Sequence, residues 1–400
     1  MAILYLIPGF PRRSETFVLA EVDGLKALGM SLRVVSFGPS LDSEVSAMGV
    51  EALQAARETV CLRRADLVPW PVRLDRRRLA MAWRLNRRLA REVSGRASAC
   101  ARFLRALAVA RLAREGAFTH VHAHWAPGAQ VAAVVNALTG IPFSLSIHAH
   151  EATTDCGHFG AVFETMAFAC FCNRAVFESV CRRFGSAASR CHLIYHGTNL
   201  ERFATIPLPP SGGVFRVVSA GRLSEVKHFD RLVRSLHVAV QRGLNVHLTI
   251  VGAGDLRAAI EELAAELGVS SRLTITGWLP HAEVASELAK GHVFTLMADD
   301  YGLPNVVLEA QAVGRPVLLS PMVAAGEAVE PGVNGWIVSA PDAYAEVADC
   351  WQRLAADENL LNRMAASARQ FVARNHDRGV HLRHLAELLR EHGQPIPLKS

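Results

Sequence analysis

The segment 298–320, ADDYGLPNVVLEAQAVGRPVLLS, has the residue types and spacing needed to bind an anion. Gly302 and Pro304 are expected to open a helix that Gly314 ends, and the apolar run Val317–Leu319 predicts the next buried strand. The helix follows a strand, so its unpaired N–H groups lie at the sheet edge where doubly wound folds bind ligands. These groups and the positive end of the helix dipole favour a negatively charged ligand.

The segment 221–230, GRLSEVKHFD, lies between a predicted strand and a predicted helix. Gly221 lets the backbone turn tightly against a ligand, and Arg222 and Lys227 place two cations where a diphosphate could sit. The alternative is a surface turn with two solvated cations. The presence of the segment 298–320 in the same half favours the binding interpretation.

Two further loops follow strands in this half of the chain. Gly252 and Gly254 belong to the sequence VGAGD, but a single G-x-G is a weak indicator of nucleotide binding. Trp278 lies in TGWLP, where a buried structural tryptophan is as good an interpretation as a ligand contact.

Histidines mark the N-terminal half. His148 lies in SIHAHE (146–151) at the end of a predicted strand, and a buried structural histidine is the alternative to a functional one. His120, His122 and His124 alternate along another strand, as metal ligands can. Because no cluster of carboxylates or cysteines completes the set, we expect no metal site.

Short β-branched segments alternate with amphipathic ones throughout, which predicts an α/β protein with two parallel-sheet, Rossmann-like domains facing a cleft. We expect an N-terminal domain at 1–205 with an arginine-rich helical insertion at 62–115. A Pro- and Gly-containing linker at 206–213 should join it to a second domain at 214–375. The tail at 376–400 has helical spacing.

The expected strands of the first domain are 2–7, 32–37, 120–123, 143–148, 175–178 and 191–195. Those of the second domain are 215–220, 246–251, 273–276, 293–297, 316–319 and 336–338.

The motifs resemble the large retaining glycosyltransferase family four, which has the GT-B fold. Its nucleotide-sugar signature usually reads E-G-x-P-x-x-x-x-E, and Glu309 matches the second glutamate while Tyr301 stands at the first. The segment 221–230 resembles its G-R-L-x-x-x-K-G pattern. The S-E-T-F sequence after Gly9 resembles members that assemble bacterial exopolysaccharides and colanic-acid-like polymers, and HGTNLERF at 196–203 resembles the interdomain turn.

The resemblance implies a retaining transfer of a hexose from a nucleotide diphosphate sugar to a lipid-linked glycan, with no metal and no cofactor besides the donor. The catalytic residues would be His148, Arg222, Lys227 and Glu309. The donor-binding residues would be Gly9, Gly221, Arg222, Lys227, Gly252, Gly254, Trp278, Tyr301, Gly302, Leu303, Pro304, Asn305 and Glu309. The terminal helices of this family often pack on the N-terminal domain, and that is the expectation for 376–400.

Tyr301 departs from the family pattern, in which a glutamate accepts hydrogen bonds from the hydroxyls of the donor sugar. A phenol carries no charge near neutral pH. Three interpretations follow: a different donor, replacement of the glutamate by Asp299 or Asp300, or an idle site in a nucleotide-binding partner of a polysaccharide assembly complex. A nucleotide-sugar epimerase is supported by fold alone.

Composition limits the cellular setting. The N-terminus MAILYLIPGFP lacks the basic region of a signal peptide, and no apolar run is long enough for a membrane span, so we expect a cytoplasmic protein. The eight cysteines form no C-x-x-C pair, which is typical of reduced thiols.

The formal charge of +6 is unevenly distributed: fifteen arginines against four acids between Leu62 and Glu115 give an excess of +11 there and leave −5 elsewhere. This region forms either a solvated helical face or a surface for anionic lipid headgroups or a phosphorylated acceptor, with Trp70 and Trp83 as interfacial side chains. No nucleic-acid-binding module is recognisable. The oligomeric state and the identities of donor and acceptor stay open.

Overall fold

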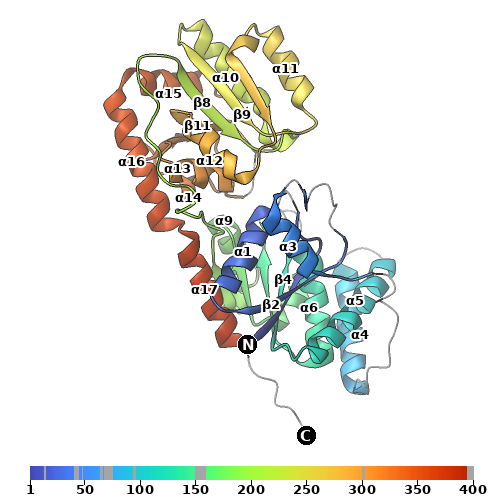
Figure 1. Cartoon of the computed structure of the whole chain (residues 1–400). Helices are drawn as coiled ribbons and strands as arrows, with labels where there is room; N and C mark the ends of the chain where they lie inside the picture. Colours follow the sequence, from blue (N-terminus) through green and yellow to red (C-terminus); the bar gives the residue numbers. More distant parts are fainter. Residues whose placement is uncertain are drawn as a thin grey trace. The chain divides into compact units, whose positions relative to one another are not determined.

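The computed structural model describes residues 1–12, 15–39, 45–46, 48–63, 66, 75–92, 96–148, 159–299 and 302–393. The chain divides into two compact units, one formed by Met1–Tyr195 with Val380–Ser400 and the other by His196–Gly379 (Figure 1).

The boundary lies before the predicted linker, which belongs to the second unit. The Arg315 guanidinium fixes it there, donating to the carbonyl oxygens of Ile206 at 2.8 Å and Pro207 at 3.0 Å. The C-terminal helix α17 (Arg378–His392) belongs almost entirely to the first unit, as expected for the tail.

A seven-stranded parallel sheet forms the centre of the first unit, in the order β3-β2-β1-β4-β5-β6-β7. Its strands are β1 Ala2–Ile7, β2 Ser31–Ser36, β3 Val60–Cys61, β4 His120–His124, β5 Phe143–Ile147, β6 Phe168–Phe171 and β7 Cys191–Leu193. The remaining helices are α1 Thr16–Ala27, α3 Val50–Glu58, α4 Arg76–Glu92, α5 Arg96–Glu115, α6 Trp125–Thr139, α8 Gly160–Thr165 and α9 Arg174–Arg183.

Strand β1 shows how helices cover both faces of this sheet. Side chains alternate between the faces of a strand, so Ile3, Tyr5 and Ile7 pack in one core with residues of α1 and α17. Leu4 and Leu6 pack in the other core with α5 and α6. Full burial of such a side chain stabilises the fold by about 1.5–3 kcal/mol, so a strand apolar on both faces is held firmly.

One expected strand of this unit is wrong, and two of its strands were not predicted. Residues 175–178 are not a strand but part of α9, because the Asn173 side chain caps the helix, accepting a hydrogen bond from the Val176 N–H at 2.8 Å. The strand is β6, FACF, and the short edge strand β3 was also not predicted.

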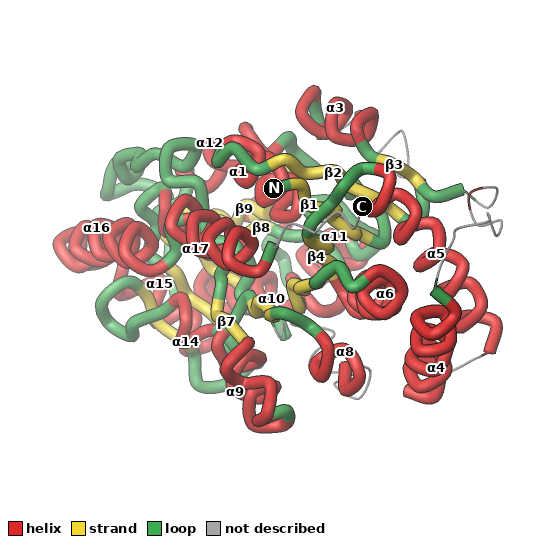
Figure 2. The backbone as a smooth tube through the Cα atoms, turned by 90° about the horizontal axis from the view of Figure 1, so that it is seen from below, coloured by secondary structure: helices red, strands yellow, loops and turns green. Residues whose placement is uncertain are grey.

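The arginine-rich insertion is helical, as predicted, and contains α4 and α5; Figure 2 shows α4, α5 and α6 alongside one another. Among the described helices none is both long enough and apolar enough to cross a membrane. The seven cysteines in the described ranges are free thiols.

The second unit has a six-stranded parallel sheet in the order β10-β9-β8-β11-β12-β13. Its strands are β8 Phe215–Ala220, β9 Val246–Val251, β10 Leu273–Gly277, β11 Val293–Leu296, β12 Val317–Leu319 and β13 Gly335–Ile337. Its helices are α10 Phe229–Gln241, α11 Arg257–Glu266, α12 His281–Ala289, α13 Asn305–Ala312, α14 Ala325–Ala328, α15 Tyr344–Ala356 and α16 Glu358–Asn375.

The same alternation separates two cores in this unit. Phe215 and Val217 of β8 face the core that contains residues of α10, α11 and α15, while Val218 and Ala220 face the core of α12, α13 and α16. The indole of Trp351 in α15 is fully buried and donates to the Thr295 hydroxyl of β11 at 3.0 Å, which satisfies both polar groups.

Candidate functional site

Each sheet has a switch point, at which neighbouring strands are connected in opposite directions. In the first unit it lies between β1 and β4, and in the second between β8 and β11. Open parallel sheets bind ligands outside the carboxyl ends of the strands at this point. The predicted site residues follow β1, β5, β8, β9, β10 and β11, so they gather at the carboxyl edges of the two sheets.

His148 follows the last residue of β5 and is 8% exposed. Its Nε2 atom lies 3.1 Å from Nδ1 of His124, the last residue of β4. The Trp125 ring packs 4.5 Å from the His148 ring, and the Phe17 ring packs 5.2 Å from it. Two aromatic rings and a buried imidazole therefore hold His148 in place.

His124 continues this contact inward. Its Nε2 atom lies 3.0 Å from Oε1 of Glu21 on α1, and the same oxygen accepts a hydrogen bond from the Tyr5 hydroxyl of β1 at 2.5 Å. Burial alone would raise the pKa of Glu21, but the charge of a protonated His124 and the hydrogen bonds from His124 and the Tyr5 hydroxyl outweigh burial and hold that pKa well below its usual range. Glu21 is therefore ionised in the interior.

The other histidines of β4 bond to serines of β5. His122 lies 2.7 Å from the Ser144 hydroxyl through Nδ1 and 3.0 Å from the Ser146 hydroxyl through Nε2, and Nε2 of His120 also lies 2.7 Å from Ser144. Burial lowers the pKa of His120 to about 3 and that of His122 well below 6.5, so both are neutral at pH 7.

Glu21, His122 and His124 present potential ligand atoms within 4.8 Å of one another. Both nitrogens of His122, and the Glu21 oxygen facing His124, already lie in hydrogen bonds. We therefore assign the group as a hydrogen-bonded network, and a site without metal stays a prediction.

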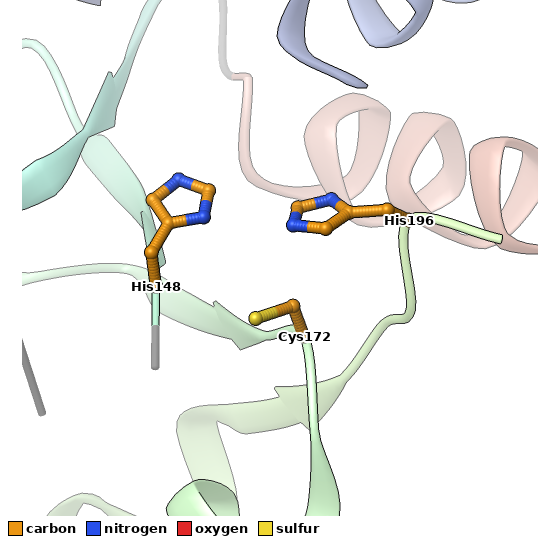
Figure 3. Close-up of side chains that lie close together, drawn as sticks. All are labelled: His148, Cys172 and His196. Carbon is orange, nitrogen blue, oxygen red and sulfur yellow. The ribbon is translucent and has the colours of Figure 1, made fainter. Parts of the chain in front are cut away.

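The remaining residues at this edge are less fully defined. Gly9 is buried after β1, with the Arg12 side chain where its Cβ would stand. Cys172 follows β6, and Figure 3 draws it with His148 and with His196, the first residue of the second unit. Ser14, His150 and Glu151 lie outside the described residues.

In the second unit Arg222 is exposed and Lys227 half-buried. Both lie on the loop 221–228 that connects β8 to α10, which we call the cation loop. The predicted Gly-x-Gly loop packs directly against this segment. A Cβ on Gly252 would stand 1.9 Å from the carbonyl oxygen of Gly221, and one on Gly254 would stand 2.3 Å from that of Leu223. Both glycines therefore shape the cation loop, and a direct contact with ligand stays a prediction for them.

His228, next to Lys227, has φ 45° and ψ 50°, in the left-handed region that favours glycine. This explains why the resembling pattern has glycine here. The His228 Nε2 atom lies 2.9 Å from Oδ2 of Asp299, just after β11, and the Arg231 guanidinium donates to both Asp299 oxygens at 2.6 and 2.8 Å. The hydrogen bond from Arg231, chiefly, lowers the pKa of Asp299.

Asp299 therefore ties the cation loop to the start of the segment 298–320. Its carboxylate is engaged there, which opposes the interpretation that it replaces the missing glutamate. Asp300 and Tyr301 lie outside the described residues. The sequence had one signal for this link, a histidine where the pattern has glycine.

The predicted helix of that segment is α13, which begins at Asn305 after Pro304 and is followed by Gly314 at φ 84°. Gly302, Leu303 and Pro304 approach it half-buried. Glu309 lies in the second turn of this helix and is 6% exposed. Trp278 is half-buried after β10 on the same sheet.

Residues 214–357, which contain all of these second-unit residues, match the family model described as Glycosyl transferases group 1. The second unit carries a group 1 glycosyltransferase domain. The cation loop and α13 thus belong to the part of the chain that defines the group 1 domain.

Curated relatives match about half of the chain at moderate identity. The amylovoran biosynthesis glycosyltransferase AmsK of Erwinia amylovora is 29% identical over 211 residues, 51% of this chain and 52% of the relative. The colanic acid biosynthesis glycosyltransferase WcaL of Escherichia coli K12 is 28% identical over 203 residues, 48% of this chain and 49% of the relative. The chain spans about half the length of these relatives.

Solved structures match nearly the whole chain. Alr3699/HepE of Anabaena, in complex with UDP, has a TM-score of 0.72 at 17% identity and covers 98% of this chain and 100% of its own. A glycosyltransferase of Rickettsia africae has a TM-score of 0.70 at 14% identity, with 98% of each chain covered. Beside the group 1 domain, the first unit therefore completes a GT-B fold.

Proposed function

We propose that the protein is a retaining glycosyltransferase that moves a hexose from a nucleotide diphosphate sugar to a lipid-linked glycan in bacterial polysaccharide biosynthesis. The observation that carries this proposal is the edge of the group 1 domain, where the Arg222 and Lys227 loop and the Glu309 helix follow the two strands of the switch point. The names of AmsK and WcaL support the polysaccharide setting.

Charge explains how this edge would act. As the diphosphate leaves, negative charge develops on it, and two cations with the N-terminus of α13 stabilise that charge more than they stabilise the bound donor. Glu309 would accept hydrogen bonds from the ribose hydroxyls, and His148 would contact the transferred sugar. No metal is needed for this step, and we expect none.

The acceptor side is proposed from α4. Leu79, Met81 and Trp83 are 39%, 52% and 42% exposed on this helix, among the exposed arginines Arg84 and Arg87. Apolar side chains between cations are typical of a helix that lies on an anionic membrane. Such docking would bring the enzyme to a lipid-linked acceptor and place the protein peripherally on the cytoplasmic face.

A second candidate is a nucleotide-binding partner without turnover, because the family glutamate is replaced by Tyr301 and Asp299 is engaged elsewhere. Isothermal titration against UDP, GDP and ADP sugars, followed by product analysis with membrane extracts, separates the two. Binding with hydrolysis or transfer supports the enzyme. Binding of one nucleotide without turnover of any donor supports the partner, and no binding at all contradicts both.

A further inference from the structure

The cation loop is anchored at both ends by apolar side chains, but its middle is not. Leu223 and Phe229 are 1% and 2% exposed in a core of the second unit, whereas Val226 between them is 49% exposed. Glu225 and His228, in the same stretch, line a cavity of about 200 Å³. Since apolar packing does not hold the stretch between the two anchors, its conformation depends on polar contacts.

Asp299, which follows β11, contacts the loop on both sides of Lys227. Its backbone N–H donates to the carbonyl oxygen of Val226 at 3.0 Å. Its Oδ2 atom lies 2.9 Å from Nε2 of His228. The same carboxylate accepts two hydrogen bonds from the Arg231 guanidinium, at 2.6 and 2.8 Å. A single residue outside the loop therefore holds the residue before Lys227 and the residue after it.

The charge of the carboxylate fixes the direction of the contact with the imidazole. The hydrogen bond from Arg231 lowers the pKa of Asp299, so the carboxylate is ionised and only accepts. Nε2 of His228 therefore carries a proton and donates it, which a neutral and a charged ring can both do. Nδ1 of the ring lies 3.6 Å from Oδ1 of Asp230, beyond hydrogen-bond distance. The contact that holds the ring is thus the one with Asp299.

The backbone of His228 turns this contact into a feature of this chain. Its φ of 45° and ψ of 50° lie in the left-handed region, which glycine adopts freely and residues with a Cβ adopt seldom. A glycine at this position, as in the resembling pattern, would form the turn but would carry no side chain. The histidine forms the same turn and adds a hydrogen bond to Asp299.

The geometry of the group decides whether an ion pair near the surface can matter. Isolated surface pairs contribute little, but bidentate pairs within a network are the exception. The pair between Arg231 and Asp299 is bidentate, the Arg231 side chain is 14% exposed, and Asp299 makes two further hydrogen bonds to the loop. The expected effect is local order of the loop and not global stability.

We propose that His228 and Asp299 are positioning residues that hold the main chain at Lys227 in the conformation that binds a diphosphate, before the donor is bound. All of these residues belong to the second unit, so the arrangement is complete within that unit. The identity of the ligand rests on the proposed function, whereas the holding of the loop is a property of the second unit itself. Such order matters because apparent affinity falls with the fraction of the protein in the binding conformation.

The first test measures amide hydrogen exchange of residues 221–230 by mass spectrometry, on the full-length chain without nucleotide. The N–H groups of Lys227 and His228 donate within the turn, so they should be protected in the parent. Asp299→Asn keeps the size of the side chain but sets an amide N–H against one of its donors, and should accelerate this exchange about fivefold or more. Asp349→Asn breaks an exposed ion pair with an arginine at the other end of α10 and is the matched control. Equal exchange in the parent and Asp299→Asn overturns the proposal.

Two substitutions of His228 separate the contact from the backbone conformation. Glutamine keeps an N–H group near the position of Nε2, whereas asparagine adopts the left-handed region more readily than glutamine but is too short to reach Asp299. Calorimetric titration uses UDP, or GDP or ADP if the parent binds one of these instead. His228→Gln should bind it nearly as the parent does, and His228→Asn about tenfold more weakly, as for a loop in its binding conformation about a tenth as often.

Affinity in His228→Asn equal to or higher than in His228→Gln overturns the proposal, because the backbone conformation alone would then decide binding. Where circular dichroism shows that either variant does not fold, Asp299→Asn takes its place in the titration and should also bind about tenfold more weakly than the parent. Asp349→Asn should bind as the parent does.

A double substitution shows whether His228 acts through Lys227. Residues that act through one another have non-additive effects. Added to Lys227→Ala, His228→Asn should therefore weaken binding less than about twofold, although alone it weakens binding about tenfold. A further tenfold loss in the double variant contradicts the positioning role.

The outcomes separate this inference from the proposed function. If the parent binds no nucleotide diphosphate, the proposed function fails and the role in donor binding fails with it, while the exchange measurement still decides whether Asp299 holds the loop. If the parent binds one and His228→Asn binds it equally well, the proposed function stands and the positioning role is wrong.

Discussion

The carboxyl edges of the two sheets carry polar groups in opposite states. In the first unit, His122, His124 and Glu21 are buried and joined by short hydrogen bonds. In the second, Arg222 is exposed and Lys227 half-buried on a loop. Buried hydrogen-bonded groups are held in one geometry, whereas exposed cations attract an anion over a longer range and are screened by salt. The first edge is built for fixed orientation and the second for attraction.

The largest expected effect concerns Glu309, a charged residue of the second unit that is buried, unlike Arg222 and Lys227. Glu309→Gln replaces a carboxylate that accepts two hydroxyl hydrogen bonds by an amide that accepts at one end. At about 1.5–3 kcal/mol for each charged hydrogen bond, nucleotide binding or turnover should fall roughly a hundredfold or more. Titration with UDP and donor turnover measure this, with the exposed Glu266→Gln as control. Full activity in Glu309→Gln would show that the site is misplaced.

The next effect tests whether the cations of the second unit attract the diphosphate of the nucleotide. Arg222→Ala or Lys227→Ala should each weaken UDP binding by about 1.5–3 kcal/mol without altering the fold. The affinity of the parent should also fall with salt, since exposed charges are screened within about 10 Å at 0.1 M. Arg234→Ala, an exposed arginine on α10, is the control. Equal affinity in all three variants would contradict the assignment.

As the pH falls, the first unit should lose stability at a higher pH than the second unit. The folded pKa of His120 is about 3, below the unfolded value of about 6.5, so its stabilisation is complete above pH 6.5 and is lost as pH falls. Between pH 6.5 and pH 5 this loss is about 2 kcal/mol, and His122 adds to it in the same direction. Glu21, with its pKa held low, stabilises the fold above about pH 4.3, and this stabilisation is lost only as the pH falls below that value.

Hydrogen exchange followed by mass spectrometry measures this for β4 and β12 separately. Burial also lowers the pKa of His292 in the second unit, so β12 should lose some protection as well. The loss should be larger in β4, because β4 carries two histidines with lowered pKa, His120 and His122. His120→Gln should flatten the response of β4. Parallel loss of protection in both strands would mean that the buried histidines do not set the acid limit.

The smallest effect concerns α4. Arg84→Glu with Arg87→Glu should reduce flotation with anionic liposomes, by about 1 kcal/mol for each charge near the surface, and leave the melting temperature nearly unchanged. Arg363→Glu, exposed on α16, is the control. Flotation that ignores salt, or is equal on neutral lipid, would contradict membrane docking.

Strands with continuous apolar runs between clear turns could be located from sequence, and β1, β8 and β9 begin and end as predicted. The segment 175–178 failed because its β-favouring residues outweighed a signal that decides the structure. Asn173 caps the helix, and Val176 and Val180 are spaced to bury one helical face.

The residues of the candidate site also differ in how far the sequence could predict them. Residues that lie together in sequence, such as the loop 221–227 and the start of α13, form the predicted local structures, and their roles stay predictions. The link from Tyr5 through Glu21 to His124 joins a strand, a helix and a second strand, and no local pattern contains it. The alternation of histidines in β4 was its one signal, and it points equally to a metal.

The close approach of Gly252 and Gly254 to the backbone at 221–223 limits how this protein can be engineered. The conformation of the cation loop depends on its contact with a loop about thirty residues further along the chain. The cation loop therefore cannot be exchanged on its own. A chimera that borrows residues 221–227 from a homologue must keep glycine at 252 and 254, because any side chain at those two positions would collide with the transplanted main chain.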